Sequence, residues 1–179
     1  MTGPVLGSLA GIRVVEISTS VAGPFFGAIL GDLGAEVIKI EQVGRGEDTR
    51  KWSPPKWGTE SVTFMSLNRN KKSVELDYKD PRGKEILTKL LASADIFVQN
   101  LRPGALAKAG FSQEELTGIN PRLITCEMSG FGRTGPKAKD AAYDPLLQAY
   151  SGIVSMMEPV DGSPVRVPLS ILDRGTAMW

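Results

Sequence analysis

Residues 12–41, IRVVEISTSVAGPFFGAILGDLGAEVIKIE, indicate the fold class. Residues 12–17 are mainly β-branched and apolar, which is typical of a buried strand. The apolar spacing of residues 25–33 suits a buried helix, and residues 36–41 read as a second strand. A strand, a helix and a strand within about thirty residues form the βαβ unit of a parallel sheet, whose crossover is right-handed. The sequence therefore predicts an α/β fold.

Strands and helices alternate through the rest of the chain. We expect strands at residues 73–76, 95–99 and 123–128. Asp80 followed by Pro81 is typical of an N-cap with proline in the first helical turn. This pair predicts a helix to about residue 91 with an apolar face made of Ile86, Leu87, Leu90 and Leu91.

Two stretches lack the periodicity of a core element. Residues 41–61 are polar and contain glycine and proline, so we expect a long excursion over the surface. Residues 130–139 are the only plausible linker. Between these stretches, Ser112 and Glu115 form the capping box of a short helix that ends near Gly118.

Composition excludes several classes of function. The chain has 21 Lys and Arg against 20 Asp and Glu, and this balance offers no overall field for nucleic acid or an anionic membrane. With one cysteine, Cys126, an internal disulfide and a cysteine-based zinc site are excluded, and no metal site is expected. With no histidine, imidazole catalysis is excluded as well. Residues 1–11 lack the pattern of a signal peptide and no apolar run approaches a membrane span, so we expect a soluble cytoplasmic protein.

Ligands of parallel α/β sheets bind beyond the carboxyl ends of the strands. The loops to consider are therefore residues 18–24, 42–50, 100–104 and 129–139. The chain has neither the G-x-G-x-x-G fingerprint nor a P-loop motif, which weakens a nicotinamide or nucleotide-hydrolysis reading. Gly23 at the start of a helix suits either anion binding by free N–H groups or tight packing of the helix on a strand.

Several charged residues invite a functional reading. Lys39 lies inside a strand, where it either marks the sheet edge or serves a site, and we favour the edge. A local group of basic residues suits phosphate, although a solvated loop face is the alternative for each one. These residues are Arg45, Arg50, Lys51, Lys56, Arg69, Lys71 and Lys72.

Asp173 is the best candidate nucleophile, because it stands alone in an apolar segment where an unpaired carboxylate is costly. Asp144 is its rival. Since Pro145 follows Asp144, we favour a plain helix N-cap for that residue.

Five segments in this order resemble the class III (CaiB–BaiF-type) CoA-transferases, a family that includes formyl-CoA transferase. They run through nearly the whole chain: Ala22-Gly23-Pro24, residues 33–41 (LGAEVIKIE), residues 68–73 (NRNKKS), residues 100–104 (NLRPG) and Asp161-Gly162. The resemblance covers about the amino-terminal half of the family's chain. It implies a Rossmann-like parallel sheet with flanking helices, of which residues 1–179 are the amino-terminal part of the large domain. The small domain and the return to the large domain are not in this sequence.

The resemblance also implies a site. The catalytic aspartate matches Asp173, and coenzyme A is held by a loop that matches residues 19–22, with Thr19, Val21 and Ala22 as contacts. Further cofactor-binding positions match Asn100, Leu101, Lys108, Lys139 and Tyr143. A basic contact of the family falls near Gln42, and Arg45 is its candidate replacement. Some transferases carry a glutamine where this chain has Val21.

The activity implied is transfer of CoA from an acyl-CoA to a small carboxylic acid through an aspartyl-CoA thioester, in an interlocked homodimer. A non-catalytic CoA-binding fragment is the alternative from another class. The related acyl-CoA racemases use a histidine where this chain has Tyr143, so a racemase is disfavoured. The apolar run at residues 171–179 stops without a cap, and we expect a fragment of a longer protein, with a natural end as the alternative.

Overall fold

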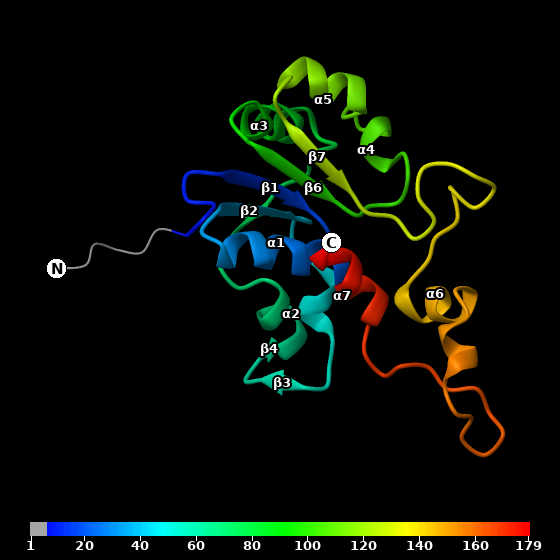
Figure 1. Cartoon of the computed structure of the whole chain (residues 1–179). Coiled ribbons are helices and arrows are strands. Elements are labelled where there is room, and N and C mark those ends of the chain that lie inside the picture. Colours follow the sequence, from blue (N-terminus) through cyan, green and yellow to red (C-terminus); the bar gives the residue numbers. More distant parts are fainter. Residues whose placement is uncertain (1–6) are drawn as a thin grey trace.

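A computed structural model, which describes residues 7–179, contains a five-stranded parallel sheet with helices on both faces (Figure 1). The α/β prediction is confirmed. Residues 1–6, part of the start examined for a signal peptide, lie outside the described residues. The strands are β1 (Arg13–Ile17), β2 (Glu36–Glu41), β5 (Lys71–Glu75), β6 (Ile96–Gln99) and β7 (Ile124–Glu127). Their order in the sheet is β5-β2-β1-β6-β7.

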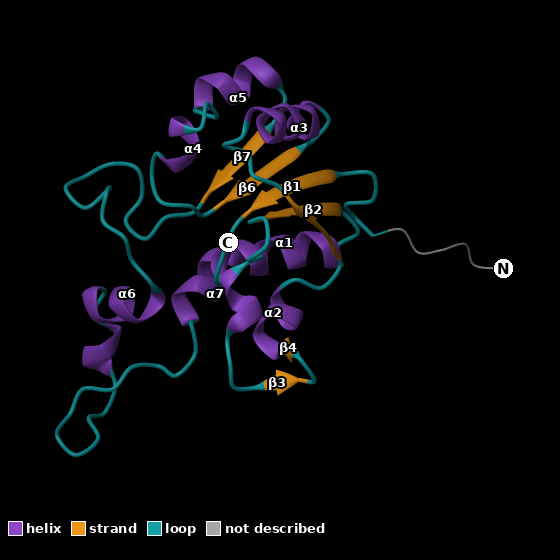
Figure 2. Ribbon diagram, turned by 180° about the vertical axis from the view of Figure 1, so that it is seen from behind, coloured by secondary structure: helices purple, strands orange, loops and turns teal. Residues whose placement is uncertain are grey.

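Two helical layers cover the sheet, with α1 and α7 on one face and α3, α4 and α5 on the other (Figure 2). The helices are α1 (Ala22–Asp32), α2 (Val62–Leu67), α3 (Pro81–Ala92), α4 (Ala105–Lys108), α5 (Gln113–Ile119), α6 (Asp144–Tyr150) and α7 (Ile171–Met178). Two 3₁₀ helices, η1 (Asp48–Lys51) and η2 (Ile153–Met156), and a hairpin of β3 (Lys56–Trp57) and β4 (Glu60–Ser61) complete the fold.

The core divides into two apolar clusters because successive strand residues face opposite sides of the sheet. Val14 packs with Leu30 of α1 on one side, whereas Val15 packs with Leu87 and Leu91 of α3 on the other. All these residues are buried. The apolar face predicted for α3 is only partly correct, because Ile86 is 46% exposed.

The predicted caps of two helices are confirmed. Asp80 accepts hydrogen bonds from the first N–H groups of α3, and Ser112 and Glu115 form the capping box of α5. The alternation of strands and helices therefore follows the sequence closely.

The excursion at residues 41–61 is not wholly a surface segment. Residues 51–60 are exposed, but Glu47 and Thr49 of the η1 region are buried, with 3% and 0% exposure. The expectation for Lys39 is wrong. β2 lies inside the sheet, between β5 and β1, and Lys39 is 1% exposed.

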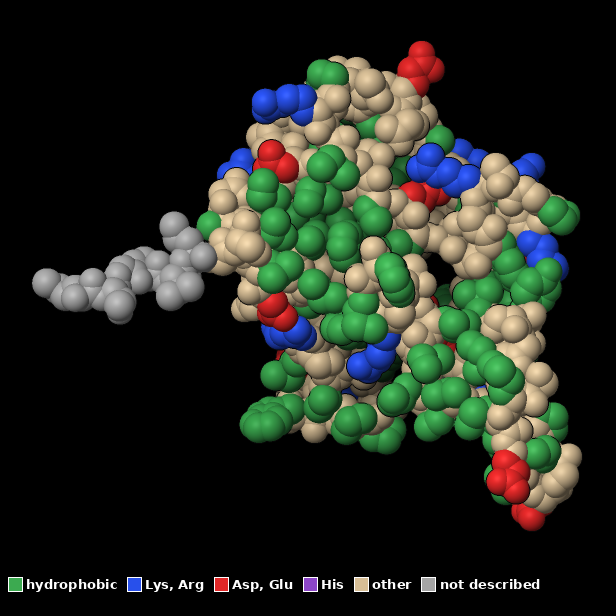
Figure 3. All heavy atoms as spheres, in the orientation of Figure 1, with side chains coloured by type: hydrophobic (Ala, Val, Ile, Leu, Met, Phe, Trp, Pro, Cys, Tyr) green, Lys and Arg blue, Asp and Glu red, His purple; other side chains and the backbone are tan. Residues whose placement is uncertain are grey.

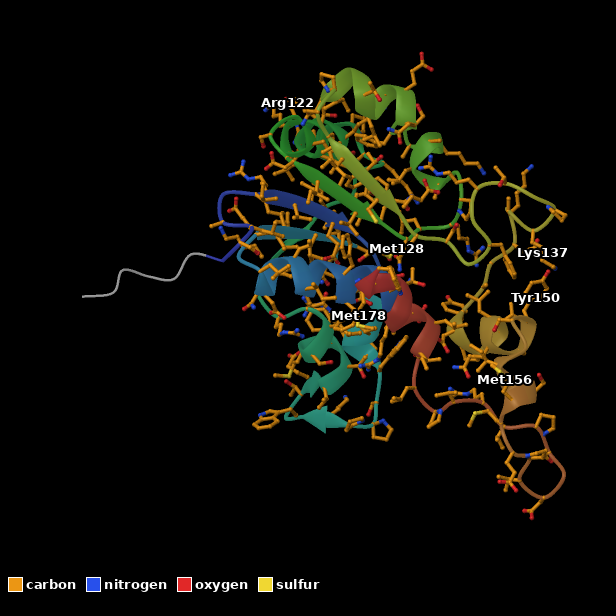
Figure 4. The ribbon with its side chains drawn as sticks, in the orientation of Figure 1. Arg122, Met128, Lys137, Tyr150, Met156 and Met178 are labelled. Carbon is orange, nitrogen blue, oxygen red and sulfur yellow. The ribbon has the colours of Figure 1, made fainter. Side chains whose placement is uncertain are left out.

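The segment after β7 leaves the sheet and returns to it. Residues 128–143 contain no helix or strand, and α6 and η2 extend away from the sheet before α7 packs against α1 (Figure 1). Lys137 lies over the ring of Tyr150 at 5.4 Å, which ties the loop to α6 (Figure 4). The helix α7 is less buried than its apolar sequence suggests, since Met178 is 68% exposed and Ala177 is its one buried residue.

Candidate active site

The site begins where the strand order reverses, between the carboxyl ends of β1 and β6. Ile17 pairs with Gln99 in the parallel register, so the loops that follow these residues lie side by side. The Asn100 side chain accepts a hydrogen bond from the Thr19 N–H at 2.8 Å and donates one to the Thr19 carbonyl at 2.8 Å. Both ends of the Asn100 amide are therefore engaged in holding the β1–α1 turn.

A cavity of about 300 Å³ opens beside this turn and brings together most of the predicted site residues. It is bounded by the β1–α1 turn, the loop after β6, the loop after β7, and α7. Seven predicted residues line it, namely Thr19, Val21, Ala22, Asn100, Leu101, Tyr143 and Asp173. Met128 at the end of β7 lines it as well (Figure 4).

Asp173 occupies the first turn of α7, where its side chain is partly buried. The pKa of Asp173 is raised from 3.8 to about 6, mainly by burial and also by the neighbouring negative charge of Asp144. Within residues 7–179, the Asp173 carboxylate accepts no hydrogen bond. Its oxygen lone pairs are free for chemistry in the cavity.

The N-cap expectation for Asp144 is wrong. Its carboxylate, 2% exposed, does not cap α6 but accepts hydrogen bonds from the N–H groups of Leu172 and Asp173, at 2.7 and 3.1 Å. Gln148, which is fully buried, donates to the other Asp144 oxygen and to the carbonyl of Leu169. Asp144 thus caps α7 from another helix and fixes Asp173 at the cavity.

Three predicted cofactor-binding residues lie outside this cavity. Lys108 is exposed at the end of α4, Lys139 is exposed in the loop before α6, and Arg45 is exposed on the turn after β2. Their contacts with CoA stay predictions. Gly23 packs tightly, because a Cβ there would lie 2.4 Å from Ser18 Cβ.

The basic group does not form one phosphate-binding patch. Arg50 binds Glu41 at 2.7 Å, and Lys72 binds Glu36 at 2.6 Å. Arg69 pairs with Asp32, and Lys71 lies buried against Glu16. The remaining members, Arg45, Lys51 and Lys56, are exposed. The mixed surface in Figure 3 agrees with this reading, since basic side chains are scattered and hydrophobic ones gather over the strands and α1.

A second cavity of about 340 Å³ lies between the carboxyl ends of β1 and β2. It meets the first at Thr19 and Leu101, which line both. Gln42 and Tyr78 are among its other lining residues. The two cavities together run along the carboxyl edge of the sheet.

Sequence reasoning missed the charged residues behind the turn. Glu47 and Lys71 contact backbone atoms of the turn or of α1, and Lys39 was assigned to an edge. A charged residue in a predicted strand indicates a buried ion pair only when its partner is known, and here the partners are distant in sequence. The indication for Asp144 was stronger, because it was already a candidate nucleophile and follows Tyr143, a predicted cofactor-binding residue.

A doubly wound sheet with its ligand cavity at the switch point and a free carboxylate in that cavity defines a class of small-ligand α/β proteins. Residues 9–179 match the model of CoA-transferase family III. The chain belongs to this family, and the resemblance found in the sequence is confirmed.

The chain is 45% identical to succinyl-CoA:glutarate CoA-transferase of Mus musculus over 171 residues, which cover 96% of this chain and 39% of that protein. It is 44% identical to acetyl-CoA:oxalate CoA-transferase of Acetobacter aceti, covering 90% of this chain and 41% of the relative. A crystal structure of a CaiB/BaiF family protein from Brucella suis superposes with a TM-score of 0.91 at 38% identity, over 97% of this chain and 47% of that one.

The chain therefore spans less than half the length of these relatives. In the described residues, no helix is long and apolar enough to cross a membrane.

Proposed function

We propose that this chain supplies the nucleophile and part of the CoA site of a transferase that moves CoA from an acyl-CoA to a small carboxylic acid. One observation carries the proposal: Asp173, with an unengaged carboxylate, shares a cavity with the β1–α1 turn and with Asn100 and Leu101. The family membership supports CoA as the substrate.

The chemistry proceeds by acyl transfer to and from the Asp173 carboxylate. A carboxylate oxygen attacks the thioester carbon of the donor, the carbon–sulfur bond breaks, and an aspartyl mixed anhydride and CoA thiolate form. The thiolate attacks the aspartyl carbonyl, which releases the donor acid and leaves an aspartyl-CoA thioester. The acceptor carboxylate attacks that thioester, which forms a second anhydride and frees the CoA thiolate. The thiolate then attacks the acyl carbon of the acceptor, which gives the new acyl-CoA and restores the Asp173 carboxylate.

The geometry suits a long ligand that lies across both cavities. Its thioester end belongs in the cavity of Asp173, and the rest of CoA continues past Thr19 and Leu101. Arg45 and Lys108 are the candidate partners for its phosphates. The first N–H groups of α1, at Ala22, provide further donors because no side chain caps this helix.

Relatives are named for glutarate and oxalate, which supports a small carboxylic acid as the acceptor. We also propose that this chain is the amino-terminal part of the large domain of a longer cytoplasmic enzyme, which forms an interlocked homodimer. In that enzyme, the parts beyond these residues would complete the acceptor pocket.

The test compares Asp173→Ala with Glu85→Ala, an exposed carboxylate of α3 far from the cavity. In the full-length protein, Asp173→Ala should lower transfer by more than about 10³-fold while CoA affinity stays within a few-fold. Hydroxylamine should trap an aspartyl-acyl species in the wild type and in Glu85→Ala only. CoA binding without any trapped species or transfer in the wild type would instead support a non-catalytic CoA-binding module.

A further inference from the structure

The turn that joins β1 to α1, residues 18–21, has a conformation that it does not favour by itself. Ser20 has a φ of 64°, a left-handed backbone conformation that is strained for a residue with a side chain. Val21 occupies the N-cap position of α1 without a side-chain cap. The shape of the turn must therefore be held by other parts of the chain.

Side chains from three other segments hold it. Glu47 Oε1 accepts a hydrogen bond from the Ser20 N–H at 2.9 Å, and Lys39 Nζ donates to the Ser18 carbonyl at 2.9 Å. Asn100 holds Thr19, the residue between them. Its side chain accepts a hydrogen bond from the Thr19 N–H and donates one to the Thr19 carbonyl, both at 2.8 Å. Three successive residues of the turn thus have their backbone fixed from outside.

The two charged members of this set belong to a buried network. Glu16 lies at its centre, with Lys39 Nζ 2.8 Å from one carboxylate oxygen and Lys71 Nζ 2.8 Å from the other. Lys71 also donates to the Pro24 carbonyl in the first turn of α1, at 2.7 Å. Glu47 lies 3.8 Å from Lys39, so two negative and two positive charges balance. Their side chains are at most 2% exposed.

Such a network is a poor source of net stability, because removing charges from water offsets most of their attraction, and apolar residues of equal volume pack as well. What it offers is directional hydrogen bonding at defined points of the backbone. Two of those points line the cavities described above: Ser20 lines the cavity that contains Asp173, and Ser18 lines the cavity between β1 and β2.

We propose that the buried charge network of Glu16, Lys39, Glu47 and Lys71 positions residues 18–21 for CoA, with Glu47 as the positioning residue for the strained Ser20. The inference rests on the proposed function, since it assumes that CoA binds at this turn. It assigns Glu47 no contact with the ligand.

Two substitutions of Glu47 separate the effect of the position of its carboxylate from the effect of its charge. Glu47→Gln keeps the length and, with its amide oxygen in the place of Oε1, an acceptor for the Ser20 N–H, but it removes the charge and the acceptor that Oε2 offers to Thr49 and Asn68. Glu47→Asp keeps the charge but withdraws the carboxylate by about 1.5 Å, the length of one carbon–carbon bond. Calorimetric titration of the full-length protein with CoA should show affinity within about threefold of wild type for Glu47→Gln and a loss of about tenfold or more for Glu47→Asp. Equal affinities, or loss in Glu47→Gln alone, would overturn the proposal.

Leu91→Ala serves as the control, because Leu91 of α3 is fully buried in the core and its truncation destabilises the fold without touching the turn. Its melting temperature should fall while its CoA affinity holds. Amide hydrogen exchange at Ser20 gives a readout free of CoA, and it should accelerate in Glu47→Asp but not in Glu47→Gln. If the wild type binds no CoA, the proposed function is wrong. If hydrogen exchange at Ser20 is unchanged in Glu47→Asp, the positioning role is wrong, whether or not CoA binds.

Should Glu47→Asp not fold, Thr49→Val replaces it. The Thr49 hydroxyl donates to Glu47 Oε2 at 2.6 Å, and valine has nearly the same volume, so this change loosens Glu47 without altering the network charge. A CoA affinity about threefold weaker and faster Ser20 exchange are expected. Wild-type values for both would overturn the proposal.

Discussion

The candidate nucleophile should make the fold less stable at neutral pH than an uncharged residue would. Asp173→Asn keeps the shape of the side chain and removes the charge that lies half-buried beside Asp144. Because burial and the Asp144 charge disfavour the ionised form in the folded state, we expect the variant to unfold at a higher urea concentration than the wild type at pH 7.5.

The magnitude follows from the pKa. The pKa of Asp173 rises from 3.8 to about 6, and each pKa unit corresponds to about 1.4 kcal/mol, so the ceiling is about 3 kcal/mol. Solvent screening of a partly exposed group reduces this to about 1–2 kcal/mol. Well below pH 3.8 the carboxyl is protonated in both the folded and unfolded states and the difference vanishes. It grows from about pH 3 to about pH 6 and stays nearly constant above, since both states are then ionised.

The assay is urea unfolding of the wild type and of Asp173→Asn at pH 3 and at pH 7.5, followed by circular dichroism. At pH 7.5 we expect a gain of about 1–2 kcal/mol for the variant, equivalent to about 2–8 °C in melting temperature for a chain of this size. At pH 3 we expect almost no gain. A gain of equal size at both pH values would refute the electrostatic origin. A variant less stable than the wild type at pH 7.5 would refute the burial of an unpaired charge.

Two further substitutions test the surroundings of the site. Asp144→Asn keeps an oxygen for the N–H groups of α7 and removes one charge. The midpoint of the pH–rate profile of kcat/KM, which we expect near 6 from the pKa of Asp173, should therefore fall toward the ordinary value of an aspartate. A midpoint that does not move would contradict this. Gly27→Ala would place a Cβ 1.9 Å from Glu16 Oε2, and the free energy of unfolding should fall by about 2 kcal/mol or more, whereas Gly118→Ala, with nothing within 4 Å, should change it by less than about 1 kcal/mol.

Much of the fold could be predicted because the signals are local. The strand at residues 36–41 has the predicted bounds, and the β1–α1–β2 unit follows from the pattern of residues 12–41. The start of α1 shows the limit: the helix begins at Ala22, whereas the apolar spacing predicted it from residue 25, because Gly23 and Pro24 in its first turn add nothing to an apolar pattern.

The site was predictable where one rule applied, that loops at the carboxyl ends of neighbouring strands converge. This rule and the resemblance place Thr19 and Asn100 together, and the cavity contains both with Asp173. Neither signal could reveal the roles of buried charges, because each depends on a distant partner. The sequence predicted Asp144 as a local N-cap, yet the N–H groups that it caps lie 28 and 29 residues away.

The placement of Asp144 leaves the Asp173 carboxylate available for the nucleophilic role that we propose for it. Aspartate in the first turn of a helix ordinarily accepts the free N–H groups there, which lowers its pKa and occupies its lone pairs. Here Asp144 takes the N–H groups of Leu172 and Asp173, so the Asp173 carboxylate stays unengaged and has a raised pKa of about 6. At pH 7 such a group is still ionised in roughly nine molecules of ten, and it is more basic than a capped aspartate. Asp144 thus stabilises the start of α7, and under the proposed function the Asp173 carboxylate attacks the thioester.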